Sequence, residues 1–196
     1  MRKKLPMLIE YDLKLNSYIV KNCKRDVKRV VIPAMYDDNV NGLKAVTKIN
    51  SWAFSHCTNL KSIEIPNSIK KIGNYAFSEC ESLINLEIPN GVKIISEAFC
   101  KGCINLETVK LSPSVTYIGY SAFQDCVKLK NVEIPNSVTS IDGSSFKNCT
   151  NLTNVEIPIT VSYIGDNAFS GVPDSALGSY KKWKELSGIR EFCLES

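Results

Sequence analysis

Two cysteines separated by two residues, Cys100 and Cys103, form the motif in this sequence that most suggests chemistry. A CxxC pair at the start of a helix, near a βαβ unit, is typical of thiol redox proteins. A zinc site requires two further ligands, usually from a second CxxC or from histidines. The chain has one histidine, His56, and no second CxxC. A structural role is therefore favoured for both cysteines, and thiol redox chemistry is kept as the least favoured of three functional alternatives.

The neighbours His56 and Cys57 are the second arrangement with catalytic potential, because a histidine can activate a thiol nucleophile. Cys57 belongs to a series of cysteines spaced by 23 residues, whereas His56 aligns with mostly polar residues. This spacing places Cys57 in the interior and His56 outside. The sequence also lacks G-x-S-x-G, phosphate-loop and H-E-x-x-H motifs. We therefore predict a protein that is not an enzyme and has no catalytic residue, metal site or cofactor.

Length, composition and charge exclude further classes of protein. The chain has 196 residues, 44% hydrophobic and 22% charged, which suits one globular domain or a short repeat array and argues against wholesale disorder. No apolar run approaches the roughly 20 residues of a membrane helix. The net charge of +4 combines +6 in residues 1–30 with −2 in the remainder. The basic end suits a solvated surface or contact with an acidic protein, a nucleic acid or an anionic membrane, and no nucleic-acid-binding motif accompanies it.

A spacing of 23 residues organises most of the chain. It relates the cysteines Cys57, Cys80, Cys103, Cys126 and Cys149, the leucines Leu60, Leu83, Leu106, Leu129 and Leu152, and the isoleucines Ile49, Ile72, Ile95, Ile118, Ile141 and Ile164. Phenylalanines also share one phase, except that Cys100 occupies the Phe position of its unit and Phe99 precedes it. Because a single unit cannot enclose its own apolar side, the units are expected to stack. The five periodic cysteines are then buried free thiols, whereas the pairing of Cys23 and Cys193 stays undecided.

Each unit consists of Leu-x-x-Ile-x-Ile-Pro, a turn, Val-x-x-Ile-Gly and Ala-Phe-x-x-Cys. The alternation in the first segment predicts a strand, which ends at proline because proline cannot donate a hydrogen bond to a strand ladder. Strands one period apart are expected to pair in parallel. The β-branched Val-x-x-Ile segment favours a second short strand without deciding the matter. The Ala-Phe-x-x-Cys segment fits either a helical turn or an irregular bend.

These motifs resemble the BspA-like family of leucine-rich repeats. The residues that carry the resemblance in one unit are Leu60, Ile63, Ile65, Pro66, Ile69, Ile72, Gly73, Ala76, Phe77 and Cys80. The resemblance covers about residues 27–172. It implies a right-handed leucine-rich-repeat solenoid, mainly β, with a parallel sheet on its concave face. It also implies non-enzymatic protein binding, often adhesion or host contact by bacterial and protist surface proteins.

Three regions are predicted: an N-terminal cap over 1–26, a solenoid of about six repeats over 27–172, and a helical cap over 173–196. Apolar and polar residues alternate from Ile9 to Leu15 before Asn16-Ser17, which predicts a hairpin. The first repeat is longer than the others, and its extra residues, within 34–45, are predicted to form a loop. A helix is predicted over 174–187. Caps are expected because an open solenoid end exposes core and a sheet edge.

The apolar stripe of the C-terminal helix consists of Leu177, Tyr180, Trp183 and Leu186. A stripe with this spacing either covers the end of the core or docks a partner, and the cap is favoured.

The candidate binding residues are the outward positions of the first strand in each unit. They are Ser62, Glu64, Asn85, Glu87, Thr108, Lys110, Asn131, Glu133, Asn154 and Glu156. They predict a polar, mildly acidic concave face that is either a merely soluble sheet surface or a site for a basic or polar protein. A secondary patch on the Val-x-x-Ile segment consists of Lys48, Lys70, Lys71, Lys93, Tyr117 and Tyr163. Exposed tyrosines are common anchors in protein interfaces.

The leading functional hypothesis is a protein-interaction module that binds a protein partner through its solenoid surface. The alternative is a purely structural, self-assembling scaffold. Nucleic acid is not the expected partner, no membrane span is expected, and the oligomeric state stays open. The apolar stretch after the first lysines is short and ends at Glu10, so no secretion signal is recognised and the cytoplasm is favoured over a secreted or surface location.

Overall fold

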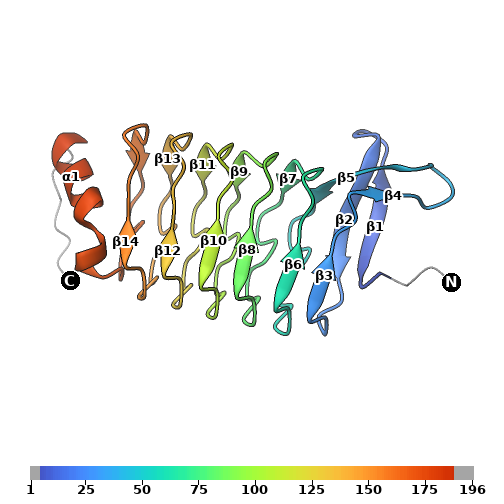
Figure 1. Cartoon of the computed structure of the whole chain (residues 1–196), viewed down its shortest axis with the longest axis horizontal. Coiled ribbons are helices and arrows are strands. Elements are labelled where there is room, and N and C mark those ends of the chain that lie inside the picture. Colours follow the sequence, from blue (N-terminus) through green and yellow to red (C-terminus); the bar gives the residue numbers. More distant parts are fainter. Residues whose placement is uncertain (1–4, 188–196) are drawn as a thin grey trace.

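The computed structural model describes residues 5–187 and shows an elongated β-solenoid between an N-terminal hairpin and a C-terminal helix (Figure 1). Each 23-residue unit forms one coil, and each coil adds a short strand to each of two sets of parallel strands. The predicted solenoid is confirmed, and the Val-x-x-Ile segment is a strand in each described coil. Arg2, Lys3, Lys4 and Cys193 lie outside the described residues, as does the end of the predicted C-terminal cap.

Two strand ladders run along the solenoid. The first ladder contains β3 (Arg29–Val31), β6 (Ser62–Glu64), β8 (Asn85–Glu87), β10 (Thr108–Lys110), β12 (Asn131–Val132) and β14 (Asn154–Val155). The second contains β5 (Lys44–Ile49), β7 (Lys71–Ile72), β9 (Ile94–Ile95), β11 (Tyr117–Ile118), β13 (Ser140–Ile141) and β15 (Tyr163–Ile164). Bonded neighbours pair in parallel and in register, so that Val109 of β10 lies between Leu86 and Val132. The apolar columns of the sequence therefore become continuous rows of side chains.

Both ladders are interrupted between the second and third coils. In the first ladder β3 pairs with β6 and a separate sheet starts at β8; in the second, β7 pairs with β5 and a separate sheet starts at β9. Ser96 stands where other coils have Gly73 or Gly119, and its hydroxyl, rather than a backbone N–H, donates to the Ile72 carbonyl at 2.6 Å. The expectation that every neighbouring pair of coils pairs as strands is wrong at this seam. The seam adjoins the coil of Phe99, which lies one residue out of phase with the other periodic phenylalanines.

The Ala-Phe-x-x-Cys segment is a series of turns rather than a helix. Two positions in each turn have a positive φ angle, and they recur with the 23-residue period. The first position contains Trp52, Tyr75, Ala98, Ser121, Ser144 and Asn167, and the second contains His56, Glu79, Gly102, Asp125, Asn148 and Gly171. The left-handed region costs a non-glycine residue about 1–2 kcal/mol. Hydrogen bonds between coils hold these residues in the left-handed region. One example is the bond from the His56 N–H to the Ser78 carbonyl at 2.9 Å.

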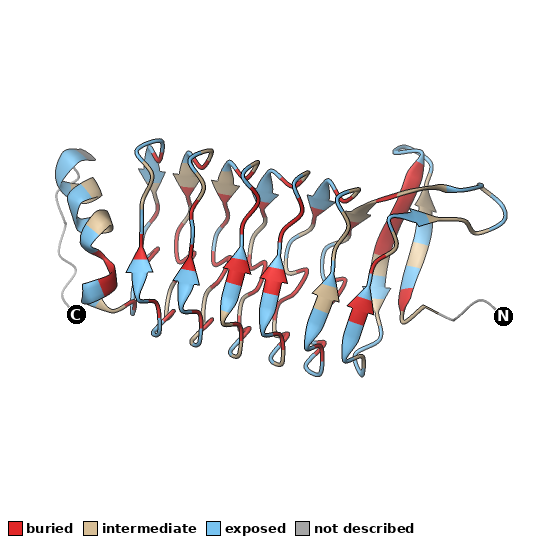
Figure 2. Cartoon of the chain, in the orientation of Figure 1, coloured by how far each residue is buried: buried red, intermediate tan, exposed pale blue. Residues whose placement is uncertain are grey.

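The core is one cluster of buried apolar residues contributed by every coil, and Figure 2 shows buried residues in each coil along the solenoid. Phenylalanine rings form a stack through its centre, with ring centroids 5.3 to 6.3 Å apart from Phe54 to Phe169. Phe99 belongs to this stack although its sequence position is shifted by one residue. In the sequence repeat, the buried Cys100 stands at the position that is Phe in the other units. The irregular third unit therefore keeps the ring in the core.

The predicted N-terminal hairpin is present, and it is formed by β1 (Met7–Asp12) and β2 (Ser17–Cys23). The first strand ends at Asp12 rather than continuing to Leu15, because the Asp12 carboxylate accepts the backbone N–H groups of Lys14 and Leu15 and closes a turn. β2 also pairs in parallel with β5. The hairpin therefore continues the second ladder and covers its N-terminal edge.

The long first repeat contains a second hairpin where only a loop is predicted. β4 (Met35–Tyr36) pairs antiparallel with the start of β5. Between them, the Asp38 carboxylate accepts the backbone N–H groups of Asn41 and Val40, and these bonds, with one from Tyr18, hold the pKa of Asp38 well below its usual range. The extra residues therefore fold back on the solenoid.

The C-terminal cap consists of a short 3-10 helix, η1 (Asp174–Ala176), and the helix α1 (Gly178–Ser187). Leu177 is buried, and the Tyr180 ring packs on Phe169 with centroids 4.9 Å apart. Leu186 is 79% exposed, so the predicted apolar stripe does not extend to the end of the helix. Tyr180 and Trp183 extend the aromatic stack beyond the last coil.

Two side chains of the cap take the place of a further coil at the edge of the last strands. The Ile157 N–H donates to the Ser179 hydroxyl at 2.9 Å, and the Trp183 indole N–H donates to the Val161 carbonyl at 2.8 Å. Each bond satisfies a backbone group that the next coil would otherwise satisfy. The cap therefore ends the solenoid by completing its hydrogen bonds as well as by covering its core.

Trp183→Phe is expected to lower the free energy of unfolding by about 1 kcal/mol, because the ring is kept and one hydrogen bond is lost. Trp183→Ala is expected to lower it further, because the ring contact with Tyr180 is lost as well. Urea unfolding followed by circular dichroism measures both. The exposed neighbour Lys182→Ala is the control, and equal effects of Trp183→Ala and Lys182→Ala would contradict this role of the cap.

Candidate binding surface

The ten residues predicted for the concave face form two parallel rows on the first ladder, and all ten are exposed. We call this surface, from Ser62 to Glu156, the Glu/Asn face. The register of the strands aligns its rows, so that Thr108 lies beside Asn85 on one side and Asn131 on the other. The Thr108 hydroxyl donates to the Asn85 side-chain oxygen at 2.5 Å. The spacing of 23 residues thus produces an ordered polar surface on one side of the molecule.

The charges of the Glu/Asn face are neutralised unevenly along the solenoid. Glu64 forms an ion pair with Arg29 at 2.5 Å, and Glu87 forms one with Lys110 at 2.7 Å. The hydrogen bond and the charge of Glu87 raise the pKa of Lys110. Within residues 5–187, neither Glu133 nor Glu156 is part of an ion pair. The unpaired negative charge is therefore concentrated on the last two coils.

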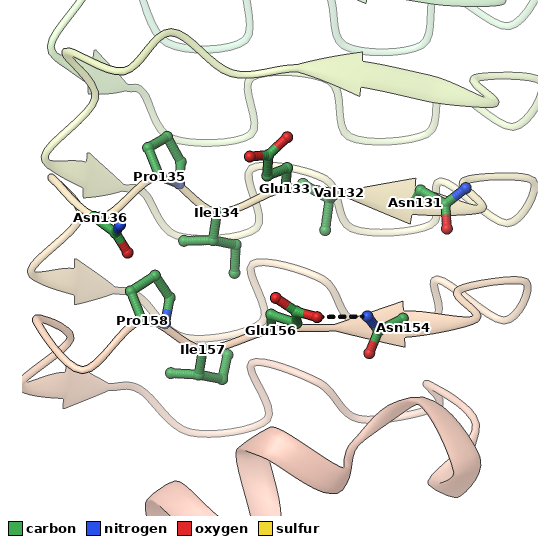
Figure 3. A pocket seen from close by; sticks show the side chains of 10 residues that line it. All are labelled: Asn131, Val132, Glu133, Ile134, Pro135, Asn136, Asn154, Glu156, Ile157 and Pro158. Atoms are coloured by element: carbon green, nitrogen blue, oxygen red, sulfur yellow. Dashed lines mark hydrogen bonds between the residues drawn. The ribbon is translucent and has the colours of Figure 1, made fainter.

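A hollow of about 460 Å³ separates these last two coils on the Glu/Asn face (Figure 3). The strands β12 and β14 are two residues long, so their pairing ends at Val132 and Val155, before the glutamates. Beyond the paired residues, the Glu133 side chain lies above Ile134 in Figure 3, and the Glu156 side chain lies above Ile157. Asn154 donates to Glu156 at 3.2 Å. The hollow combines two carboxylates with apolar walls, which the repeat pattern alone does not predict.

The five periodic cysteines are buried and free, as predicted, and each thiol in the four later coils also donates a hydrogen bond to a carbonyl of the preceding coil. The Cys103 thiol, for example, donates to the Phe77 carbonyl at 3.1 Å. These thiols therefore also bind polar backbone groups and are more than small apolar fillers. Burial raises the pKa of Cys100 well above its usual value, which is the opposite of what a redox CxxC requires.

Cys23 is partly exposed and free, and its thiol donates to the Pro6 carbonyl at 3.3 Å. His56 is exposed whereas Cys57 is buried, which does not favour a nucleophile pair. His56 also belongs to a column of left-handed backbone positions, which polarity in the sequence does not reveal. Among residues 5–187, no group of three or more His, Cys, Asp or Glu side chains is arranged to hold a metal ion.

The secondary patch lies on the second ladder, away from the first. Lys48 pairs in register with Lys71, and Tyr117 and Tyr163 occupy the same row on later strands. Lys70 and Lys93 are exposed beside this row. Ile94 is not among the residues predicted for the patch. It lies in the row between Lys71 and Tyr117 and is 50% exposed. None of the described helices is both long and apolar enough to traverse a bilayer.

Comparison with solved structures supports the same architecture. A T. pallidum leucine-rich repeat protein, TpLRR, has a TM-score of 0.76 and 23% identity, with 97% of each chain covered. A leucine-rich repeat protein from Bacteroides ovatus has a TM-score of 0.67 and 21% identity, with 89% of this chain and 59% of that chain covered. One from Eubacterium ventriosum has a TM-score of 0.59 and 22% identity, with 92% and 50% covered. At these identities the similarity establishes the fold.

Comparison of sequences identifies the family. No curated protein matches the chain significantly. The sequence profile described as BspA type Leucine rich repeat region matches residues 38–149 and 80–195, with six copies. These matches include every strand of the two ladders except β3. The chain therefore belongs to the BspA-type leucine-rich repeat family.

Proposed function

We propose that this protein is a non-enzymatic interaction module whose Glu/Asn face binds a protein with basic side chains. The observation that carries the proposal is the two rows of exposed side chains along the parallel strands of the first ladder. Proteins of this repeat class use extended surfaces of this kind for binding. The carboxylates of Glu133 and Glu156, which form no ion pair within residues 5–187, support a strongest contact at the last two coils, because Glu64 and Glu87 already have cationic partners.

The first experiment is affinity capture from the native lysate, followed by purification of the captured protein and titration against variants of this chain. Glu133→Lys/Glu156→Lys is expected to weaken binding about tenfold or more, because charge complementarity becomes repulsion. Glu64→Lys/Glu87→Lys changes the net charge equally and is the matched control, for which a smaller loss is expected. Equal affinity of both double variants and the unmodified chain would overturn the proposal for this face.

Adhesion or contact with a host is the more specific form of the proposal. It requires exposure at the cell surface rather than a location in the cytoplasm. Antibody labelling of intact and permeabilised cells distinguishes the two locations. A self-assembling scaffold is the alternative, and light scattering that shows a mass rising with concentration would favour it. Thiol redox activity through Cys100 and Cys103 would require fast thiol reaction in the native protein, which their burial opposes.

A further inference from the structure

Four lysines lie on or beside the strands of the second ladder. Lys48 and Lys71 lie directly opposite one another on β5 and β7, and Lys70 and Lys93 stand on the adjoining positions. Within residues 5–187, none of the four forms an ion pair. Like charges in register on neighbouring strands repel and destabilise the sheet. A partner outside the folded chain would explain why these lysine charges are not compensated within it.

The first ladder shows that this protein can compensate its charges across coils. On this ladder Lys110 bonds Glu87, and just before its strands Lys130 bonds Glu107, each at 2.7 Å and one period apart. The second ladder has the same spacing, and a carboxylate in its row would neutralise the lysines in the same way. Instead its row continues with Ile94, Tyr117, Ser140 and Tyr163. Lys48 and Lys71 thus form one half of the row, and the residues from Ile94 onward form the other half, across the seam between β7 and β9.

The second half of the row has features of a contact surface. Ile94 and Tyr163 are 50% and 53% exposed. The Tyr117 hydroxyl donates to the Asp142 carboxylate at 2.5 Å, which fixes the ring on the surface. Fixed aromatic rings lose little conformational freedom on binding, and tyrosines are frequent anchors of protein interfaces. The apolar half therefore suits side-chain contacts of a protein.

We propose that this surface, the Lys/Tyr face (Lys48, Lys70, Lys71, Lys93, Ile94, Tyr117 and Tyr163), docks an acidic protein segment whose apolar side chains adjoin its carboxylates. Charge complementarity assigns the carboxylates to the lysines, and the apolar side chains then lie on Ile94 and the tyrosines. A nucleic acid places charge along its whole length, which the second half of the row does not match. The proposal concerns a different face and an oppositely charged partner from the Glu/Asn face, so each proposal can fail alone.

The test uses the full chain and fluorescent peptides that carry a glutamate-rich half and a half rich in Leu and Val, in both orders. Binding is measured by fluorescence anisotropy, with double-stranded DNA and phosphatidylserine vesicles as competing probes. Lys48→Glu/Lys71→Glu is expected to weaken peptide binding about tenfold. Tyr163→Ser is expected to weaken it severalfold for the amphipathic peptides and to leave binding of an all-glutamate peptide unchanged.

The control is Lys61→Glu/Lys128→Glu, which makes the same change in net charge at two exposed lysines outside the Lys/Tyr face. It is expected to change the affinity by less than about twofold. Circular dichroism confirms that all variants are folded. The proposal is overturned if both double variants lose affinity equally, if no peptide of either order binds, or if DNA or vesicles bind the Lys/Tyr face more tightly than the peptides do.

Discussion

Phe123→Ala is expected to lower the free energy of unfolding by about 3–5 kcal/mol, which is a large part of the stability of a domain. The Phe123 ring is fully buried, and its centroid lies 5.4 Å from that of Phe146 and 6.3 Å from that of Phe99. Removing it leaves a cavity in the middle of the aromatic stack, where the hydrogen-bonded turns on both sides limit collapse. Urea unfolding followed by far-UV circular dichroism measures the change.

Ile159→Ala provides the matched control, because Ile159 is fully exposed in the coil that follows Phe146. Its expected effect is within about 0.5 kcal/mol. A loss below about 1 kcal/mol for Phe123→Ala would contradict a central role of the stack, since cavity formation alone exceeds that value.

The protein is expected to lose stability steeply as the pH rises above 9, because its buried thiols resist ionisation. Burial raises the pKa of Cys80, Cys100, Cys126 and Cys149 above the ordinary value of 9.0, and that of Cys149 to about 12. At pH values between the ordinary thiol pKa and the raised pKa of the folded state, the thiol of the unfolded chain has released its proton and the thiol of the folded chain keeps it. Each such thiol then lowers the free energy of unfolding by about 1.4 kcal/mol per pH unit.

Below pH 9 the thiols are protonated in both states, so the stabilisation is fully present there. It is lost progressively toward the folded pKa values. A hydrogen bond to Asp142 raises the pKa of Tyr117 to about 12 and adds a loss of the same sign above pH 10. Urea unfolding at a series of pH values measures the slope of stability against pH.

Cys149→Ala separates this effect from a general loss of stability. The variant lowers stability at all pH values, because the hydrogen bond of the Cys149 thiol to the Phe123 carbonyl is lost. Its stability should nevertheless fall less steeply between pH 9 and about 12, because one titrating thiol has been removed. An unchanged slope would show that Cys149 does not contribute to alkaline unfolding.

The repeat pattern predicted much of this protein because each coil contacts mainly its neighbours. A position that is apolar in every unit must face the next unit, so burial of Cys126 and Phe123 and exposure of Glu133 follow from spacing alone. The two caps follow from the need to cover both ends. These inferences require periodicity and no knowledge of side-chain geometry.

Predictions from the sequence are wrong where the structure depends on which atoms meet between coils. The seam beside β9 places Ser96 where a glycine N–H bonds elsewhere. The hairpin of β4 depends on how the long first repeat folds back onto β5. The exposure of Leu186 depends on how far the last helix extends beyond the final coil.

The 23-residue period is sufficient to predict the solenoid, its buried columns and the two rows of polar side chains, because it repeats the same local environment. The distribution of charge on those rows depends instead on contacts in three dimensions. The Arg29–Glu64 ion pair joins the irregular first repeat to the second, whereas within residues 5–187 Glu133, Glu156 and the lysines around Lys71 form no ion pair. Ion pairing depends on the reach of a side chain across a few ångströms, which periodicity does not specify. That difference between paired and unpaired charge is what distinguishes the two candidate binding faces.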